Sequence, residues 1–271
     1  MIAPSIQVTY EELRAFLFSL LLVQARILAM FSVLPISTAA LMPGPLRYAV
    51  AAGVGLVVAP VLAPAVLHGA IPGGVEFIAL LIKEAAVGFV LGWLVAIPFW
   101  AFEAVGFVID NQRGASIAAT INPLTGHDSS PLGILFNQAF IVFFFVTNGF
   151  RLLLELIYDS YLQWNPLTFW PQLTEASGAL LFQQFNRLSM IGLLLAAPVM
   201  VAMFISEIGL ALVSRFVPQL QVFFLAMPIK SALAFLVLIL YGTTLFDYGR
   251  AYVQEIGTWV PRLGPLVHPA R

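Results

Sequence analysis

The polar residues of this sequence gather in one central stretch, and this is where chemistry would be expected first. Residues 98–131 read PFWAFEAVGFVIDNQRGASIAATINPLTGHDSSP. Near the end of this stretch, residues 126–130 (GHDSS) place the three side-chain types of a hydrolytic triad side by side. A triad needs a nucleophile, a base and an acid that separate chain segments bring together. Consecutive residues of a Gly/Ser turn rarely converge in this way, so the sequence argues against catalysis here.

Other catalytic and metal-binding motifs are also absent from the sequence. It contains no phosphate-binding loop, no dinucleotide fingerprint and no HExxH pair. The lack of cysteine excludes disulfides, thiolate metal sites and thiol nucleophiles. The three histidines, His68, His127 and His268, are too far apart to form a local metal motif. We therefore predict a protein that is not an enzyme and that binds no cofactor or metal.

A polar stripe is the more informative feature of the central stretch. Its members are spaced 3, 4 and 3 residues apart from residue 103 to residue 113, so on a helix they share one face. Asp110 and Arg113 are then placed to pair at positions i and i+3. Small residues follow, and they weaken the helix and favour close backbone contacts. The candidate functional residues are Glu103, Gly106, Asp110, Gln112, Arg113, Gly114 and Ser116.

The remainder of the sequence is typical of a membrane protein. Of its 271 residues, 61% are hydrophobic and 9% are charged, and the mean hydropathy is +0.98, whereas soluble domains carry about 25% charged residues. The net charge of −1 favours neither nucleic acid nor an anionic membrane surface as a partner. We predict an all-α, membrane-associated fold of about six long apolar helices, several of them kinked by proline, built from helical hairpins. The expected helices cover residues 13–34, 48–67, 77–102, 133–157, 188–213 and 222–246.

Three local patterns refine this prediction. Gly88, Gly92 and Ala96 share one helix face, and small residues at this spacing let a second helix approach closely. The phenylalanines of the fourth helix indicate packing against neighbouring helices. Residues 158–187 contain aromatic, Pro and Asn residues, which favour an interfacial loop or a short amphipathic helix.

Five ionisable residues lie inside apolar segments, where charge is costly. At a bilayer centre each costs about 3 kcal/mol, so five cost about 15 kcal/mol. They therefore need partners in a protein assembly, or their helices do not lie in lipid. Lys83 and Glu84 are neighbours that point about 100° apart on a helix, so we expect each to pair elsewhere. These buried-charge candidates are Arg26, Lys83, Glu84, Glu207 and Lys230.

One pairing follows from the spacing of the last two helices. Glu207 lies 11 residues before Pro218, and Lys230 lies 11 residues after Gln219. In an antiparallel hairpin that turns at residues 218–219 the two side chains fall at the same height. We therefore predict that Glu207 and Lys230 approach each other, the alternative being that each meets a different subunit.

The motifs also resemble those of a known family. Residues 103–106 (EAVG), 109–116 (IDNQRGAS) and the turns at 122–129, with a second match over residues 215–231, resemble the T subunit of the type III secretion export apparatus. This family is called SctT, YscT, HrcT or SpaR, and FliR is its flagellar relative. The resemblance covers nearly the whole chain, and the DNQRG wording favours virulence injectisomes over flagella. Three positions depart from the family pattern: Asn122 replaces Asp, Asn148 replaces Gly, and Gln221 replaces Asn.

The resemblance implies a non-enzymatic component of an export gate in the bacterial inner membrane. T subunits join R and S subunits in a helical, cone-shaped complex that is the entry portal for unfolded secreted proteins. The U and V components, inner-rod or needle proteins and membrane lipid are further implied partners, and nucleic acid is not. The assembled complex is raised toward the periplasm, so the buried charges would face sister subunits and an aqueous lumen. Residues 98–131 would form the plug-like loop beneath the pore constriction, and the polar stripe would either anchor a displaceable plug or form a static salt-bridge network between subunits.

Other functions stay open at this point. A self-contained secondary transporter would use intramembrane Lys and Glu for protons or substrate, but it predicts inverted repeats that the sequence does not show. The flagellar counterpart of the same gate is a second alternative, and an integral membrane enzyme is disfavoured by the missing motifs. We treat residues 1–271 as a single membrane-type domain, with a central polar stretch at 98–131 and a C-terminal helical hairpin at 188–246.

Overall fold

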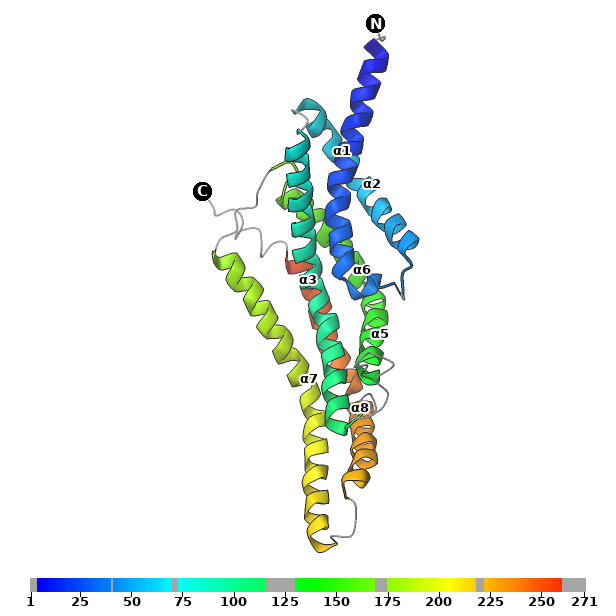
Figure 1. Cartoon of the computed structure of the whole chain (residues 1–271), viewed down its shortest axis with the longest axis vertical. Helices are drawn as coiled ribbons and strands as arrows, with labels where there is room; N and C mark the ends of the chain where they lie inside the picture. The colour runs from blue at the N-terminus through cyan, green and yellow to red at the C-terminus, as the bar shows by residue number, and fades with distance from the viewer. Residues whose placement is uncertain are drawn as a thin grey trace. The chain divides into compact units, whose positions relative to one another are not determined.

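The computed structural model describes residues 4–39, 41–69, 73–115, 130–168, 175–217 and 222–259. Within these ranges the chain is helical and contains no strand, which confirms the predicted all-α fold (Figure 1). Five helices are long and apolar enough to cross a membrane, and a bent pair adds a sixth span if it is counted as one. The chain is therefore a multi-pass membrane protein. Its helices are α1 (Pro4–Val33), α2 (Gly44–His68), α3 (Gly74–Arg113), α5 (Pro131–Val146), α6 (Gly149–Gln163), α7 (Glu175–Phe216) and α8 (Val222–Glu255), with short 3-10 turns at Pro35–Ser37 and Ile256–Thr258.

Helix α3 contains all four residues of the predicted polar stripe, and it runs without a break to Arg113. This confirms that the stripe residues lie on one helix. Prolines lie inside four of the helices, where each removes one backbone hydrogen bond. The bends that we expect at these prolines stay predictions. The prolines are Pro60 and Pro64 in α2, Pro98 in α3, Pro198 in α7 and Pro228 in α8.

Of the two alternatives predicted for residues 158–187, an interfacial loop or a short amphipathic helix, the loop was wrong for most of the segment. Helix α6 continues to Gln163, and α7 begins at Glu175. The residues at the start of α7 read EASGALLFQQFNR, and Glu, Ala, Leu and Gln are strong helix formers. Trp164, Asn165 and Pro166, which suggested a loop, follow the end of α6, whereas Asn186 lies within α7.

The fourth apolar segment forms two helices and not one, because the chain turns through 74° between α5 and α6. At the break Asn148 has φ of 60°, in the left-handed region. Asn and Gly adopt this conformation at a lower cost than other residues, since the short amide can hydrogen-bond locally. Asn148 therefore suits the conformation of the break.

The chain forms two compact units. The first comprises Met1–Ala96, Gly149–Leu181 and Gln254–Arg271, and the second comprises Ile97–Asn148 and Phe182–Val253. The expected single domain over residues 1–271 stays a prediction. We describe each unit separately.

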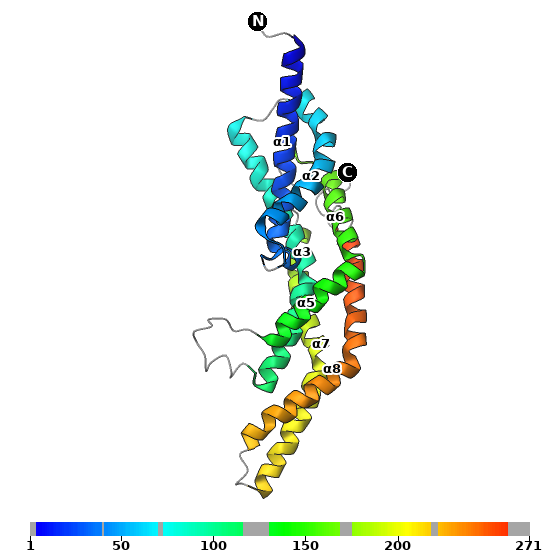
Figure 2. The same cartoon turned by 90° about the vertical axis from the view of Figure 1, so that its right-hand side faces the viewer.

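In the first unit α1 and α2 lie side by side, as both views show (Figures 1 and 2). The N-terminal half of α3 also packs on α1, and here the predicted small-residue face is confirmed. A Cβ added to Gly88 would collide with the backbone carbonyl of Arg26, and one added to Gly92 would lie 2.7 Å from the carbonyl oxygen of Met30. The two helix backbones are thus in direct contact.

In the second unit a cluster of phenylalanines joins α3, α5 and α8. The ring centroid of Phe140 lies 4.9 Å from that of Phe99 and 4.3 Å from that of Phe102. From α8, the ring of Phe246 lies 5.6 Å from Phe102 and 5.2 Å from Phe143. The phenylalanine-rich segment therefore serves helix packing, as predicted.

Helices α7 and α8 run beside each other near residues 207 and 230 (Figure 2). This is the predicted C-terminal hairpin, although its turn at residues 218–221 lies outside the described residues. Many large apolar side chains of both helices are exposed, among them Phe204, Ile208, Leu236 and Ile239. Such a surface is suited to lipid or to other apolar protein.

Candidate functional site: the C-terminal turn of α3

Asp110 is the centre of the polar stripe, and its carboxylate is buried, with 2% of the residue exposed. Its Oδ1 lies 2.7 Å from Nε of Arg113, which confirms the predicted pair. Its Oδ2 accepts hydrogen bonds from Ser130 Oγ at 2.6 Å and from the backbone N–H of Leu132 at 2.9 Å. The buried carboxylate therefore has one cationic partner and two further hydrogen-bond donors, as a buried charge requires.

The partners of Asp110 form the first turn of α5. Ser130 is the N-cap residue of that helix, and its Oγ accepts from Gly133 N at 2.9 Å, while its carbonyl accepts from Ile134 N at 3.0 Å. Pro131 has no N–H, and the N–H of Leu132 donates to Asp110, so every N-terminal donor of α5 has an acceptor. Negative charge is also favourable at a helix N-terminus.

Asp110, Ser130 and Leu132 together join the C-terminal end of α3 to the N-terminal end of α5. We call these three residues the loop-base clasp, because they hold together the chain on either side of residues 116–129. Residues 116–129, which include Ser116, Asn122 and the predicted turn at 126–129, lie outside the described part of the chain.

The other two members of the stripe face the same helix. Asn137 Nδ2 donates to Glu103 Oε2 at 2.9 Å. Gly106 faces the α5 backbone so closely that an added Cβ would collide with Leu132 and Gly133. The stripe is thus the surface on which the start of α5 is docked. Asn137 was missed by the sequence analysis, and Ser130 was considered there only as part of a triad-like run. The Ser-Pro pair of an N-cap and first helical residue is the signal that identifies Ser130.

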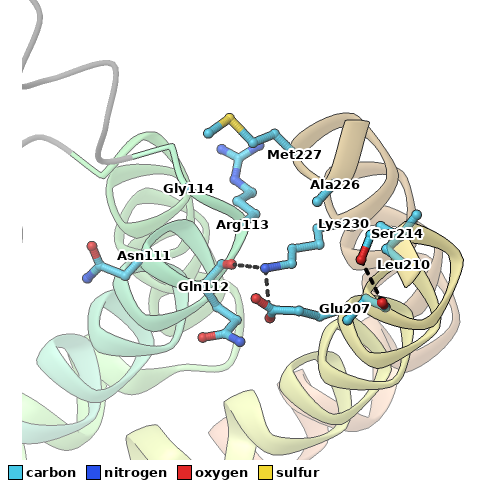
Figure 3. Close-up of a pocket in the computed structure, with 11 residues that line it drawn as sticks. Asn111, Gln112, Arg113, Gly114, Glu207, Leu210, Ser214, Ala226, Met227 and Lys230 are labelled. Carbon is cyan, nitrogen blue, oxygen red and sulfur yellow. Dashed lines mark hydrogen bonds and ion pairs between the residues drawn. The ribbon is translucent and has the colours of Figure 1, made fainter. Parts of the chain in front are cut away.

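The opposite side of the α3 terminus meets the α7–α8 hairpin. Lys230 Nζ lies 2.8 Å from Glu207 Oε2, which confirms the predicted pair, and 3.5 Å from the backbone oxygen of Gln112 (Figure 3). The last carbonyls of a helix lack intrahelical donors, and a lysine is a favourable partner for them. Two neighbouring carbonyls are satisfied within the chain, Asp110 O by Ala115 N and Asn111 O by Gly114 N.

Gly114 ends α3 with φ of 84°, a conformation for which glycine is favoured. Beside this terminus the structure has a pocket of about 420 Å³. Figure 3 shows Lys230 and Glu207 pointing toward one another across it. The pocket is lined by Asn111, Gln112, Arg113, Gly114, Glu207, Leu210, Ala211, Ser214, Ala226, Met227 and Lys230.

The two partners differ in burial within the chain. The Lys230 side chain is 11% exposed, but that of Glu207 is 50% exposed. Burial of Glu207 in an assembly stays a prediction. Arg113 is better covered, and its guanidinium lies 5.5 Å from the Phe235 ring centroid.

The remaining three charges form a separate buried cluster in the first unit. Arg26 and Glu84 make a bidentate pair, with Nε–Oε2 at 2.8 Å and Nη2–Oε1 at 2.9 Å. Lys83 Nζ lies 2.6 Å from Glu84 Oε1. The expectation that Lys83 and Glu84 do not pair with each other was therefore wrong, whereas the expectation that each has a partner elsewhere is confirmed, by Arg26 for Glu84 and by backbone carbonyls for Lys83. The side chains of Lys83 and Glu84 meet away from the axis of α3, where Arg26 binds the Glu84 carboxylate.

The cluster also involves α6. Arg26 Nη1 donates to Ser160 Oγ at 2.9 Å, and Nη2 donates to the Trp164 carbonyl at 3.0 Å. The guanidinium carbon lies 4.2 Å from the ring centroid of Tyr161. The family resemblance implied that Arg26, Lys83 and Glu84 would face sister subunits and an aqueous lumen. Within this chain all three already have partners. Residues 26, 84 and 160 are distant in sequence, and no local spacing relates them.

Among the described residues, no group of three or more His, Cys, Asp or Glu side chains could hold a metal ion. The candidate site consists of hydrogen bonds and ion pairs at helix ends.

The sequence is similar to known proteins over most of its length. A model of the family described as bacterial export proteins, family 1, matches residues 17–256. The Yop proteins translocation protein T of Yersinia pestis is 40% identical over 226 residues, which are 82% of this chain and 85% of that protein. The surface presentation of antigens protein SpaR of Salmonella typhimurium is 33% identical over 235 residues, 86% of each chain. The flagellar biosynthetic protein FliR of Bacillus subtilis is 33% identical over 172 residues, 63% of this chain and 66% of that protein. This chain, with its terminal turn of α3 anchored to α5 and α8, is a member of family 1 of the bacterial export proteins.

Proposed function

We propose that this chain is the T-type subunit of a type III secretion export gate in the bacterial inner membrane. In this role it assembles with R- and S-type subunits into the entry portal for unfolded secreted proteins, performs no catalysis and needs no cofactor. The U and V components and the inner-rod or needle proteins are further expected partners. Support comes from the family membership and from the greater identity to a Yop translocation protein than to a flagellar one.

The observation that carries the proposal is the loop-base clasp. Asp110 binds both Ser130 Oγ and Leu132 N, so the ends of α3 and α5 are fixed to each other on either side of residues 116–129. An export gate needs a segment that can obstruct a passage and yet return to the same place. A clasp at the base of such a segment supplies the fixed point, and we propose that residues 98–131 act as a plug-like element.

The residues that we assign to this element follow the contacts described above. Glu103, Gly106 and Asp110 dock α5 on α3, while Gln112 and Arg113 face α8 through Lys230 and Phe235. Gly114 turns the chain out of the helix, and Ser116 belongs to the segment beyond. The exposed apolar side chains of α7 and α8 support burial by lipid or sister subunits in the assembly.

The composition of the purified assembly tests this function. The chain is tagged in a bacterium that carries its gene, extracted with a mild detergent and examined by native mass measurement. We expect it to remain bound to R- and S-type subunits. Recovery of a lone monomer or homodimer that binds a small solute would contradict the proposal and favour a transporter. A complex that contains flagellar R- and S-type subunits would assign the chain to a flagellar gate.

A further inference from the structure

Lys83 occupies a place in the first unit that the export function does not explain. Four oxygen atoms surround its Nζ. They are Glu84 Oε1 at 2.6 Å and the backbone oxygens of Asn165 at 3.2 Å, Pro166 at 3.0 Å and Thr168 at 3.1 Å. The lysine side chain is only 4% exposed. All four neighbours are acceptors, and an ammonium has three N–H donors, so they can serve the Glu84 carboxylate and two of the three carbonyls at any one time.

The three carbonyls belong to the turn that follows α6, residues 164–168, which we call the cradle turn. Pro166 is buried, whereas Asn165 and Thr168 are exposed. Carbonyl oxygens that converge on one point repel one another, and the buried Pro166 oxygen would also carry a desolvation penalty without a donor. The cradle turn has internal bonds, from Leu167 N to Asn165 Oδ1 at 2.9 Å and from Thr168 Oγ1 to Asn165 O at 2.9 Å. These bonds shape the turn, but they leave the Pro166 and Thr168 oxygens directed at the lysine.

We propose that Lys83 is a positioning residue that serves as an internal cation, and that the cradle turn is an ammonium-binding site which the chain fills with its own side chain. The arrangement is that of a small-cation site, with one carboxylate and several backbone carbonyls, but the cation is tethered to α3. The bidentate Arg26–Glu84 pair holds the carboxylate in place and so completes the site.

The cradle turn also forms part of a pocket wall. Asn165 and Pro166 line a pocket of about 480 Å³ together with Tyr161 and with Val57 and Val61 of α2. By fixing the turn, Lys83 fixes this wall. The position of the wall therefore depends on a charge in α3 and not only on apolar packing between α2 and α6.

The absence of cysteine makes a direct test practicable. Leu167→Cys changes a half-buried side chain of the cradle turn, keeps the Thr168 hydroxyl that donates to Asn165 O, and provides a single site for a nitroxide spin label in the full-length chain in detergent. In the otherwise unchanged protein the label should be immobile. Lys83→Ala should shift the spectrum to a mobile component. Ammonium or methylammonium chloride should reverse that shift. Tetramethylammonium chloride at equal ionic strength should not, because this ion has no N–H to donate and is too large for the site.

Two further variants separate a specific site from a general loss of structure. Lys83→Met keeps the volume and removes the charge, so its label should be mobile in every salt. Lys230→Ala removes a lysine with one carboxylate partner and one carbonyl partner in the second unit, and should leave the label immobile. An immobile label in Lys83→Met, or equal effects of all three salts on Lys83→Ala, would overturn the proposal. If Lys83→Ala does not yield folded protein, the Lys83→Met spectrum alone decides whether the charge holds the turn.

Discussion

The carboxylate of Glu207 lies 2.8 Å from the ammonium of Lys230, across the hairpin of α7 and α8. The same ammonium reaches the backbone oxygen of Gln112 at the end of α3. One lysine thus connects three helices of the second unit, and it contacts Gln112 within the proposed plug-like element.

The coupling between these two side chains can be measured with a double-mutant cycle. Because Glu207 is half exposed, we expect a coupling free energy of about 0.2–1 kcal/mol between Glu207→Gln and Lys230→Met in thermal unfolding of the full chain. Lys230→Met should cost more than Glu207→Gln, since it also removes a donor from the Gln112 carbonyl. Strictly additive effects would show that the pair contributes nothing beyond its separate contacts.

The loop-base clasp predicts a second non-additive pair. Ser130→Ala removes an N-cap and should cost about 0.5–2 kcal/mol, and Asp110→Ala should cost at least as much, because Arg113 loses its ion pair. The double variant should cost less than the sum of the two, since both remove the Ser130–Asp110 bond. Ser214→Ala is a matched control, because its hydroxyl bonds only within its own helix and is exposed. Additive costs at 110 and 130 would argue that the clasp is not one unit.

Deletion of residues 111–116 tests the plug-like role directly. The clasp residues remain, so the complex should assemble, but the shortened segment should no longer obstruct the passage. We expect leakage of ions or small dyes through the complex in vesicles. The length-preserving variant Gln112→Ala is the control for side-chain loss alone. A tight and export-competent complex after the deletion would refute the role.

Gly106 predicts a steric effect with a matched control in another helix. Gly106→Ala places a Cβ against the backbone of Leu132 and Gly133 and should destabilise the second unit by about 1–3 kcal/mol. Gly209→Ala, in α7, meets nothing within 4 Å and should stabilise the helix by up to about 1 kcal/mol. Thermal unfolding of both variants checks the difference in sign. A neutral Gly106→Ala would mean that α5 is not docked closely on α3.

Much of the fold follows from local sequence. Apolar length predicted the spanning helices, and the 3, 4, 3 spacing predicted that Asp110 and Arg113 share a face and pair. The distance of Glu207 and Lys230 from a common turn predicted their ion pair. Each of these inferences uses only helix geometry. It relates residues that are close in sequence, or residues equally far from one connecting turn.

The errors concern relationships that no local pattern encodes. The partners of Arg26 lie 58 and 134 residues away, at Glu84 and Ser160, so only the packed structure reveals them. The break at Asn148 depends on one left-handed residue within an otherwise apolar run. The start of α7 was missed because interfacial aromatic residues were given more weight than the helix formers after residue 175.

The contact of Gly88 and Gly92 with α1 limits how the first unit can move. Each glycine faces one α1 carbonyl, and the two carbonyls, of Arg26 and Met30, have the same four-residue spacing. A shift of α3 by one turn, about 5.4 Å along its axis, would bring Glu84 or Ala96, which share this face, to a carbonyl beside which only hydrogen fits. A sliding ratchet between these two helices is therefore not available as a source of motion during export, and the pair would have to separate before it could change register.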